Sequence, residues 1–338
     1  MVTKVGINGF GRIGRQVLKA ISDRYEGKLE VVAINDLVPV EINANLLKYD
    51  SNYGRWHREV HADGDALVVD GRRVKVFAER DPVAIPWGSV GVEIVIESTG
   101  LFTDATKAVA HKRDSVKKVI ISAPAKNEDV TIVLGVNPEA YDPAKHHVIS
   151  NASCTTNGLA PVVKVIVDNF GLVKGQMTTI HSYTNSQQIL DKAAGTDPRE
   201  MRAGAMNIVP TSTGAARALK LVIPSIDGKI DGLAYRVPTP TVSIVEIVAL
   251  TERDTTKEEI NAIIVETGGE KMKGILGLTM DPVVSMDMKG DERSSIVDGM
   301  STNVVGGNLV KVAAWYDNEW GYACRISDLC NFLVERGL

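Results

Sequence analysis

Cys154 stands where the chain could present a reactive thiol. It follows the apolar strand end Val148-Ile149, lies in the polar stretch Ser153-Cys154-Thr155-Thr156-Asn157, and precedes an amphipathic run from Leu159 to Phe170. This pattern places Cys154 at a helix N-terminus, where the dipole and unpaired N–H groups stabilise a thiolate. The residues predict a nucleophile, with a small buried packing cysteine as the alternative.

His181 is the side chain best suited to assist that thiol. It follows the predicted strand Gln176–Ile180, and an imidazole within hydrogen-bond reach can accept a thiol proton. A structural histidine is the alternative interpretation. The other two cysteines, Cys324 and Cys330, lack the paired spacing of a zinc site, so we expect no metal and interpret them as packing residues of the terminal helix.

A glycine-rich motif, Gly9-Phe10-Gly11-Arg12-Ile13-Gly14, follows the predicted strand Lys4–Asn8 and opens the predicted helix Arg12–Ser22. Gly9 permits a tight turn, Gly11 lets the backbone approach a pyrophosphate, and Gly14 allows close packing of helix on strand. Asp36 ends the next predicted strand, where its carboxylate can accept hydrogen bonds from a ribose 2′-hydroxyl. The motif and the acid together favour NAD, because a 2′-phosphate would be repelled by Asp36.

The pattern of strand-like and helical segments differs between two parts of the chain. Up to residue 150, β-branched runs at 4–8, 29–35, 92–97 and 118–122 alternate with helical stretches, which is typical of a Rossmann-type doubly wound parallel sheet. Longer alternating runs at 232–237, 242–250 and 309–316 predict an α+β catalytic domain over 151–317 with a mostly antiparallel sheet. We expect a functional loop at 182–207 and a closing helix at 318–338 that joins the first domain, residues 1–150.

The 338 residues are 44% hydrophobic and 24% charged, with a formal net charge of −4. These are ordinary globular values. They predict no general attraction to nucleic acid or to an anionic membrane. No apolar run approaches the roughly 18 to 20 residues of a membrane helix, and the N-terminus lacks a signal peptide, so we expect a cytoplasmic protein.

Six separated segments resemble one enzyme family. They are Asn8–Arg15, Ser150–Asn157, His181–Thr184, Pro210–Ala216, Arg236–Pro240 and Trp315–Glu319. In this order they are similar to the phosphorylating glyceraldehyde-3-phosphate dehydrogenase family. A shared nucleotide-binding half alone would not produce matches in both halves of the chain.

The resemblance implies NAD-dependent conversion of D-glyceraldehyde 3-phosphate and inorganic phosphate to 1,3-bisphosphoglycerate, a step of glycolysis. Cys154 would attack the aldehyde to give a thiohemiacetal, and His181 would accept protons as hydride leaves for the nicotinamide. Phosphate would cleave the resulting thioester. The Cys154 N–H and His181 would stabilise the oxyanion.

The resemblance also assigns binding roles. The cofactor would be bound by the glycine motif and by Arg12, Ile13, Asp36, Arg80, Ser122 and Asn318. Asn318 would hold the nicotinamide carboxamide. Thr184 and Arg236 would bind the C3 phosphate, and the attacking phosphate would be bound by Ser153, Cys154, Thr155, Thr213 and Gly214. Hydroxyl, N–H and guanidinium donors suit two such anion sites.

The loop departs from the family pattern at Ser186, Gln188, Ala193 and Glu200. Glu200 stands where the family has the second of two arginines, and a carboxylate beside a phosphate is repulsive. We interpret Ser186 and Glu200 as replacing a family ion pair together, with positive charge supplied by Arg199, Arg202 or Lys192. A weakened phosphate site and an alignment shift of one residue are the alternatives.

Further departures leave other choices open. Ala193 replaces a common proline in a loop that often accompanies cofactor choice, so some NADP use stays open. Gly158 replaces the second cysteine of many relatives, which excludes a local disulfide with Cys154.

The alternatives for function are a related enzyme such as erythrose-4-phosphate dehydrogenase and a secondary role in binding RNA or surface partners. The resemblance implies a homotetramer, with the loop at a subunit interface.

Overall fold

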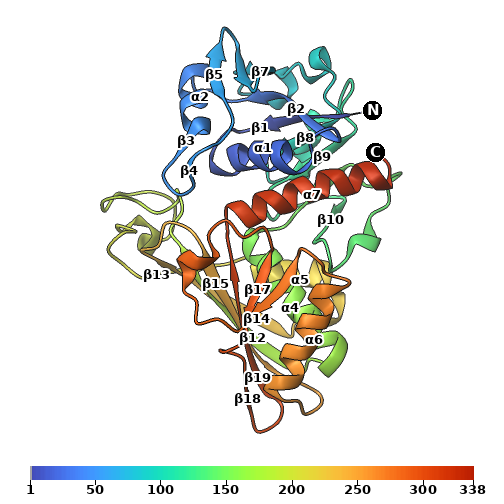
Figure 1. Ribbon diagram of the computed structural model, residues 1–338, viewed down its shortest axis with the longest axis vertical. Coiled ribbons are helices and arrows are strands. Elements are labelled where there is room, and N and C mark those ends of the chain that lie inside the picture. The colour runs from blue at the N-terminus through green and yellow to red at the C-terminus, as the bar shows by residue number, and fades with distance from the viewer. Residues whose placement is uncertain (1) are drawn as a thin grey trace. The chain divides into compact units, whose positions relative to one another are not determined.

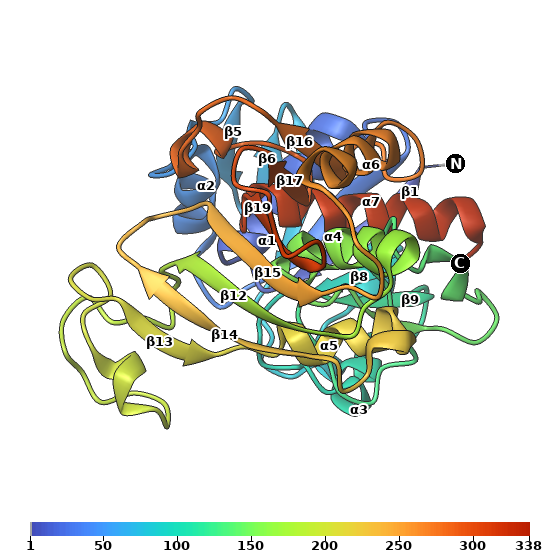
Figure 2. The same cartoon turned by 90° about the horizontal axis from the view of Figure 1, so that it is seen from below.

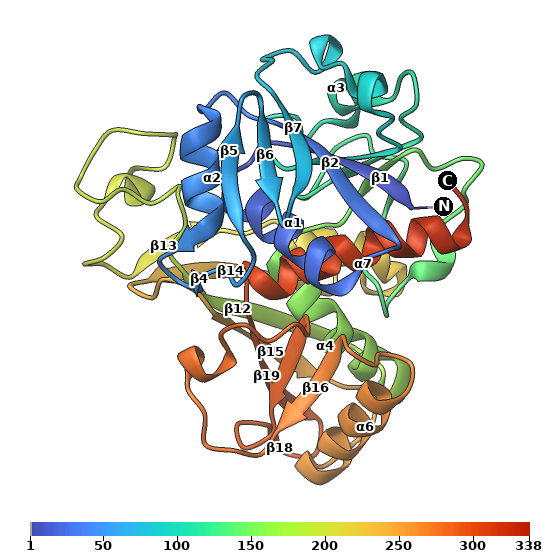
Figure 3. The same ribbon diagram turned by 45° about the horizontal axis from the view of Figure 1, so that its top comes forward.

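Short strands rich in valine and isoleucine build the sheet of the first unit, in a computed structural model that describes residues 2–338. Nine strands lie in the order β10-β11-β9-β8-β1-β2-β7-β6-β5. Every pair from β10 to β7 is parallel, and β7, β6 and β5 pair antiparallel at one edge (Figure 3). The predicted Rossmann-type parallel sheet is confirmed.

The strands of this unit are β1 (Thr3–Asn8), β2 (Leu29–Asn35), β3 (Tyr49–Asp50), β4 (Gly54–Arg55), β5 (Val60–Asp63), β6 (Ala66–Val69), β7 (Arg72–Phe77), β8 (Ile94–Glu97), β9 (Lys118–Ile121), β10 (Val130–Thr131) and β11 (Val148–Ser150). Its helices are α1 (Arg12–Arg24), α2 (Val40–Lys48), α3 (Ala105–Ala108) and most of α7 (Trp320–Arg336). The unit consists of the residues up to Ile132 together with Glu139–Ala152 and Ala323–Leu338.

The edge formed by β5, β6 and β7 was absent from the sequence prediction. Its strands are short, and β5 and β7 carry charged residues that pair across the edge, Arg73 with Asp63 and Lys75 with Asp65 in the adjoining turn. β5 and β7 therefore lack the continuous apolar run of a buried parallel strand, and the buried apolar run of β6 is only four residues long.

Alternating side chains build the second sheet, whose main path is β13-β14-β12-β15-β19-β17-β16, with β18 paired to β19. The β12–β14 and β16–β17 pairs are parallel and the others antiparallel, so the predicted mostly antiparallel sheet is also confirmed. In β15, buried residues alternate strictly with partly exposed ones. Figure 2 shows β13, β14, β12 and β15 side by side, with the loop before β13 projecting beyond the sheet.

The strands of the second unit are β12 (Lys174–Ser182), β13 (Val209–Ser212), β14 (Ile230–Val237), β15 (Ser243–Leu250), β16 (Leu276–Thr279), β17 (Ser295–Asp298), β18 (Asn303–Val305) and β19 (Leu309–Tyr316). Its helices are α4 (Cys154–Phe170), α5 (Ala215–Val222) and α6 (Lys257–Gly269). This unit comprises Val133–Pro138 and Ser153–Tyr322. Between β12 and β13 the chain forms one 3₁₀ turn, Pro198–Met201.

The terminal helix α7 begins at Trp320, two residues after the predicted start, and ends at Arg336. Its later part packs in the first unit beside α1 (Figure 1), where Tyr25 donates a hydrogen bond to Asp328 at 2.6 Å. Tyr141 likewise donates to the carbonyl of Gly337 at 2.9 Å. Within residues 2–338, every helix is too short or too polar to cross a membrane.

Gly232 controls how closely β14 approaches β12. A Cβ added there would overlap the carbonyl oxygen of Met177 on β12. We expect Gly232→Ala to lower stability by about 1–3 kcal/mol, because overpacking forces the strands apart. Gly269→Ala is the matched control, since a Cβ at Gly269 meets nothing within 4 Å. Thermal unfolding of both variants measures the difference, and equal melting temperatures would contradict the prediction.

Candidate active site

A pocket of about 370 Å³ opens at the carboxyl ends of the parallel strands in the first unit. It is lined by Asn8, Gly9, Gly11, Asn35, Asp36, Leu37, Glu79, Arg80, Ser98, Thr99, Leu101 and Phe102. Ligands of open parallel sheets bind at this edge. Of the predicted cofactor residues, the pocket brings together Gly9, Gly11, Asp36 and Arg80.

The glycine motif has the geometry that a dinucleotide requires. Gly9 has a φ of +89°, and a Cβ there would stand 2.7 Å from the backbone nitrogen of Thr99. At Gly14 a Cβ would overlap the carbonyl of Gly9, so only glycine lets α1 start this close to β1. Gly11 is exposed with open space around it and provides no side-chain cap for α1. The first N–H groups of the helix are therefore available to an anion.

Asp36 is held in position before any ligand arrives. One carboxylate oxygen accepts a hydrogen bond from the Phe10 N–H at 2.8 Å, and the other accepts from the Val38 N–H at 2.9 Å. The group thus points into the pocket from a fixed place. This arrangement fits a ribose with free hydroxyl groups better than one carrying a 2′-phosphate.

Five predicted cofactor residues lie outside the pocket lining: Gly14, described above, and Arg12, Ile13, Ser122 and Asn318. Arg12 binds the buried carboxylate of Asp50 at 2.6 Å. Ile13 is the second residue of α1, and the Ser122 N–H donates to the Glu97 carbonyl at 3.0 Å, just after β9. Asn318 lies in the second unit, after β19.

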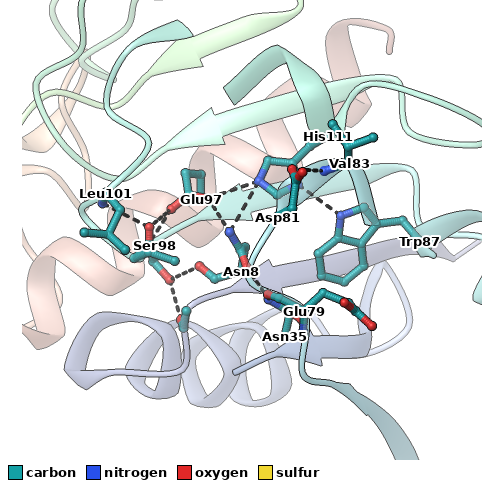
Figure 4. A network of polar contacts seen from close by, with 12 residues as sticks. Asn8, Asn35, Glu79, Asp81, Val83, Trp87, Glu97, Ser98, Leu101 and His111 are labelled. Atoms are coloured by element: carbon teal, nitrogen blue, oxygen red, sulfur yellow. Dashed lines mark hydrogen bonds and ion pairs between the residues drawn. The ribbon is translucent and has the colours of Figure 1, made fainter. Parts of the chain in front are cut away.

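The floor of the pocket is a polar network that the sequence analysis did not identify (Figure 4). Glu97 accepts hydrogen bonds from Asn8 Nδ2 at 2.6 Å and from Thr99 N at 2.8 Å, and its carboxylate lies 3.0 Å from His111 Nε2. The Trp87 indole can only donate, so His111 Nδ1 accepts from it at 3.1 Å. The His111 proton therefore lies on Nε2, and neutral His111 donates to Glu97.

Asn8, at the end of β1, connects the network from Glu97 at the end of β8 to Asn35 at the end of β2. Asn35 Nδ2 donates to Asn8 Oδ1 at 2.8 Å and to the Glu79 carbonyl at 2.9 Å, and Asn35 Oδ1 accepts from the Glu79 N–H at 2.8 Å. Asn8, Asn35 and Glu97 are each the last residue of a buried strand. A polar residue closing each strand is the sequence signal that could have identified this floor.

In the second unit, Cys154 is the first residue of α4, and Ser153 caps that helix by accepting a hydrogen bond from the Thr156 N–H at 3.0 Å. Cys154 Sγ lies 3.5 Å from His181 Nε2, at the end of β12. The two predicted catalytic residues are thus in direct contact. Burial raises the pKa of the Cys154 thiol, and the positive charge of Arg236 opposes this rise.

His181 is 4% exposed, and its Nδ1 lies 2.8 Å from the Ser182 carbonyl oxygen and 2.5 Å from Arg236 Nη1. Burial and the charge of Arg236 lower the pKa of His181 to about 3. The imidazole is therefore neutral at pH 7, which is the state that can accept a proton from the sulfur. Two groups compete for Nδ1, because the Ser182 carbonyl can only accept a hydrogen bond and the Arg236 guanidinium can only donate one. The tautomer that donates its Nδ1 proton to Ser182 O is the one that leaves the Nε2 lone pair facing Cys154.

Tyr316 is a further site residue that the residue pattern did not identify. Its buried hydroxyl is hydrogen-bonded to Thr155 Oγ1 at 3.0 Å and to Thr179 Oγ1 at 2.9 Å, and its ring meets His181 edge-on. Burial raises its pKa, so it stays a neutral phenol. At Gly158, a Cβ would stand 3.1 Å from the Tyr316 ring.

The predicted phosphate residues occupy three places in the second unit. Arg236 contacts His181, and Thr184 lies in the loop after β12, where its hydroxyl contacts Ser186 at 3.0 Å. Thr213 and Gly214 form the turn between β13 and α5. The Thr155 hydroxyl is already bonded to buried Tyr316, which makes its backbone the better donor for an anion.

The charged residues of the loop pair locally. Arg199 binds Asp197 at 2.7 Å, Arg202 binds Asp191 at 2.7 Å, and the Glu200 carboxylate accepts a hydrogen bond from the Thr211 hydroxyl. Neither arginine is therefore a free cation beside Glu200, contrary to the interpretation that one of them supplies charge to an anion.

A nucleotide-binding unit and a unit with a cysteine–histidine pair together define an NAD-dependent oxidoreductase that uses covalent catalysis. Residues 3–105 match the family model "Glyceraldehyde 3-phosphate dehydrogenase, NAD binding domain", and residues 153–318 match "Glyceraldehyde 3-phosphate dehydrogenase, C-terminal domain".

Relatives match along the whole chain. A glyceraldehyde-3-phosphate dehydrogenase of Geobacillus stearothermophilus is 53% identical, and glyceraldehyde-3-phosphate dehydrogenase 1 of Bacillus subtilis is 54% identical, each over 338 residues and 100% of both chains. Glyceraldehyde-3-phosphate dehydrogenase 2 of Synechocystis is 49% identical over 335 residues and 99% of both chains. The chain belongs to the glyceraldehyde-3-phosphate dehydrogenase family, and NAD is its cofactor.

Glu97 offers a direct test of the pocket floor. We expect Glu97→Gln to weaken NAD binding about tenfold and to lower the melting temperature, because an amide NH₂ would face donors that now meet a carboxylate. Glu93→Gln is the matched control, since Glu93 lies just before the same strand and pairs with Lys117 at 2.8 Å. Calorimetric titration with NAD measures both, and equal affinities would contradict the role of Glu97.

Proposed function

We propose that this chain oxidises D-glyceraldehyde 3-phosphate to 1,3-bisphosphoglycerate, with Cys154 as the nucleophile and His181 as the base. The observation that carries the proposal is the 3.5 Å contact between Cys154 Sγ and His181 Nε2 at the N-terminus of a capped helix. NAD, when bound, supplies the hydride acceptor. Both family models and the full-length relatives support the same activity.

The first covalent step joins Cys154 Sγ to the aldehyde carbon. His181 Nε2 takes the thiol proton, and the carbonyl oxygen becomes an oxyanion that the Cys154 N–H and His181 stabilise. His181 returns that proton to the oxyanion, which gives the hydroxyl of the thiohemiacetal, and accepts it again as the carbon loses a hydride and becomes a thioester. Inorganic phosphate attacks the thioester, the C–S bond breaks, and the thiolate returns for the next cycle. The energy of oxidation is conserved because water is excluded.

The anion sites follow from the donors around this pair. Arg236 and Thr184 bind the C3 phosphate, and the attacking phosphate meets Ser153, Thr155, Thr213 and Gly214. Arg236 is the cation in direct contact with His181, and its buried Nε has no hydrogen-bond partner within the described chain. An unpartnered buried guanidinium N–H favours an arriving anion.

We assign the cofactor contacts residue by residue. Gly9, Gly11, Gly14, Arg12 and Ile13 receive the pyrophosphate at the start of α1. Asp36 binds the adenosine ribose, Arg80 and Ser122 add contacts, and Asn318 holds the nicotinamide carboxamide. Residues 1–150 with helix 318–338 form the NAD-binding domain, and 151–317 form the catalytic domain with loop 182–207.

The active form is a homotetramer that works in the cytoplasm, where the Cys154 thiol stays reduced. Four apolar side chains in and beside the loop support the assembly, because each is more than two-thirds exposed in the single chain: Ile189, Leu190, Met206 and Ile208. Exposed apolar side chains gathered in one segment mark a contact surface. A monomer in light scattering would contradict the tetramer.

The nucleophile is tested by Cys154→Ser. We expect NADH formation from glyceraldehyde 3-phosphate, NAD and phosphate to fall at least about a thousandfold, because a hydroxyl is a far weaker nucleophile than a thiolate. His181→Asn should lower kcat by about 10²–10⁴-fold, the usual contribution of a general base. Cys330→Ala is the control, since that buried thiol lies on α7. Full activity of Cys154→Ser, or faster turnover with erythrose 4-phosphate, would refute the proposed reaction.

Cofactor choice is tested at Asp36. We expect kcat/KM for NAD to exceed that for NADP by about a hundredfold, because the fixed carboxylate repels a 2′-phosphate. Asp36→Asn should reduce this ratio by about tenfold or more, because the negative charge is removed; one of the two donors, Phe10 N–H or Val38 N–H, keeps an amide oxygen as its acceptor. Steady-state kinetics with both cofactors decides the matter, and an unchanged ratio in Asp36→Asn would exclude the carboxylate as the selector.

A further inference from the structure

The oxygen and the nitrogen of the Asn318 side-chain amide differ in their hydrogen bonding. It is 6% exposed, and its Oδ1 accepts two hydrogen bonds, from Ser182 Oγ at 2.9 Å and from Ser243 Oγ at 3.1 Å. Its Nδ2 makes no hydrogen bond to any part of the described chain. The amide NH₂ of this largely buried side chain therefore keeps both N–H donors available to a ligand.

The two serines determine which end of the amide is held by the protein. Ser243 Oγ already accepts a hydrogen bond from the Ser182 N–H at 3.0 Å, so its own proton is available for Asn318. Ser182 Oγ donates to the same oxygen. Two hydroxyl donors aimed at one atom favour an oxygen there over an NH₂ group. The donor end of Asn318 is left facing outward.

We propose that Ser182 and Ser243 are positioning residues that fix Asn318 with its NH₂ toward the cofactor, and so select the orientation in which the nicotinamide carboxamide is bound. The inference rests on the proposed function, which gives Asn318 the carboxamide. An outward NH₂ group binds the carboxamide oxygen. An amide turned by 180° would instead present an acceptor, and would bind the carboxamide NH₂ and favour the opposite face of the ring.

Ser182 also links this orientation to the base. Its carbonyl oxygen lies 2.8 Å from His181 Nδ1, and its hydroxyl holds Asn318. The end of β12 thus positions the proton acceptor through its backbone and the cofactor anchor through its side chain. The two functions are separable, because Ser182→Ala removes the hydroxyl and leaves the carbonyl in place.

The test compares two ligands that differ only at the nicotinamide. We expect Ser182→Ala to weaken NAD binding about fivefold, the effect of one lost hydrogen bond, and to leave ADP-ribose binding unchanged. Ser243→Ala should act in the same direction, and the double variant more strongly. Calorimetric titration with NAD and with ADP-ribose gives the ratio of the two dissociation constants. Retained ADP-ribose binding also shows that each variant is folded.

Kinetics provide a second measurement. The KM for NAD of Ser182→Ala should rise about fivefold while the pH profile of kcat stays that of the wild type, because the Ser182 carbonyl remains beside His181. With glyceraldehyde 3-phosphate deuterated at C1, the NADH product should carry a measurable fraction of label on the minority face. A serine with a purely structural role would not alter this fraction.

Ser295→Ala is the matched control. Ser295 is fully buried in β17 of the same sheet, and its hydroxyl has no hydrogen-bond partner within residues 2–338. The control should leave both dissociation constants unchanged. A wild-type protein without NADH production would overturn the proposed function. An active wild type whose ratio of dissociation constants is the same in Ser182→Ala and Ser243→Ala would overturn the positioning role alone.

Discussion

The register of β12 against its two neighbours is the constraint on which the catalytic unit depends. β12 pairs parallel with β14, which sets His181 opposite Arg236, and antiparallel with β15, which brings the Ser182 N–H to the Ser243 hydroxyl. β15 in turn sets Ser243 opposite Tyr316 of β19. A slip of one residue along β12 would turn His181 to the other face of the sheet. The pairing of these strands thus positions His181 and Arg236, and it also positions the two serines whose hydroxyls bond to Asn318.

Cys154 is positioned by a helix rather than by a strand of this sheet. It opens α4, a helix that packs against β15, β17 and β19. The helix end is fixed by the Ser153 cap, and the first turn is tied to the sheet by the Thr155–Tyr316 hydrogen bond. Gly158 allows the Tyr316 ring to lie against the helix, since a Cβ there would stand 3.1 Å from it. The loss of the family's second cysteine at this position is therefore compatible with tight packing around the nucleophile.

Local signals in the sequence were sufficient for the parts of the sites that local geometry determines. The glycine motif, Asp36 and the helix start at Cys154 each depend on a few consecutive residues, and all three lie where the patterns predicted. Glu97, Tyr316 and Ser243 were missed because their roles arise from partners 14 to 161 residues away. A polar residue at a strand end, such as Glu97, marks a position, but neither it nor a lone serine shows which partner it meets until strand pairing brings that partner close.

Substitutions in loop 182–207 can be misinterpreted when each is considered without its neighbours. Glu200, taken alone, adds repulsion to an anion site, yet its carboxylate accepts the Thr211 hydroxyl. Ser186, where the family usually has an aspartate, bonds to the hydroxyl of Thr184. Arg199 and Arg202 are each paired with a neighbouring carboxylate, so of the three loop cations only Lys192 makes no ion pair within residues 2–338. The cation in direct contact with His181 is instead Arg236, whose position is set by the same β12–β14 pairing that positions His181.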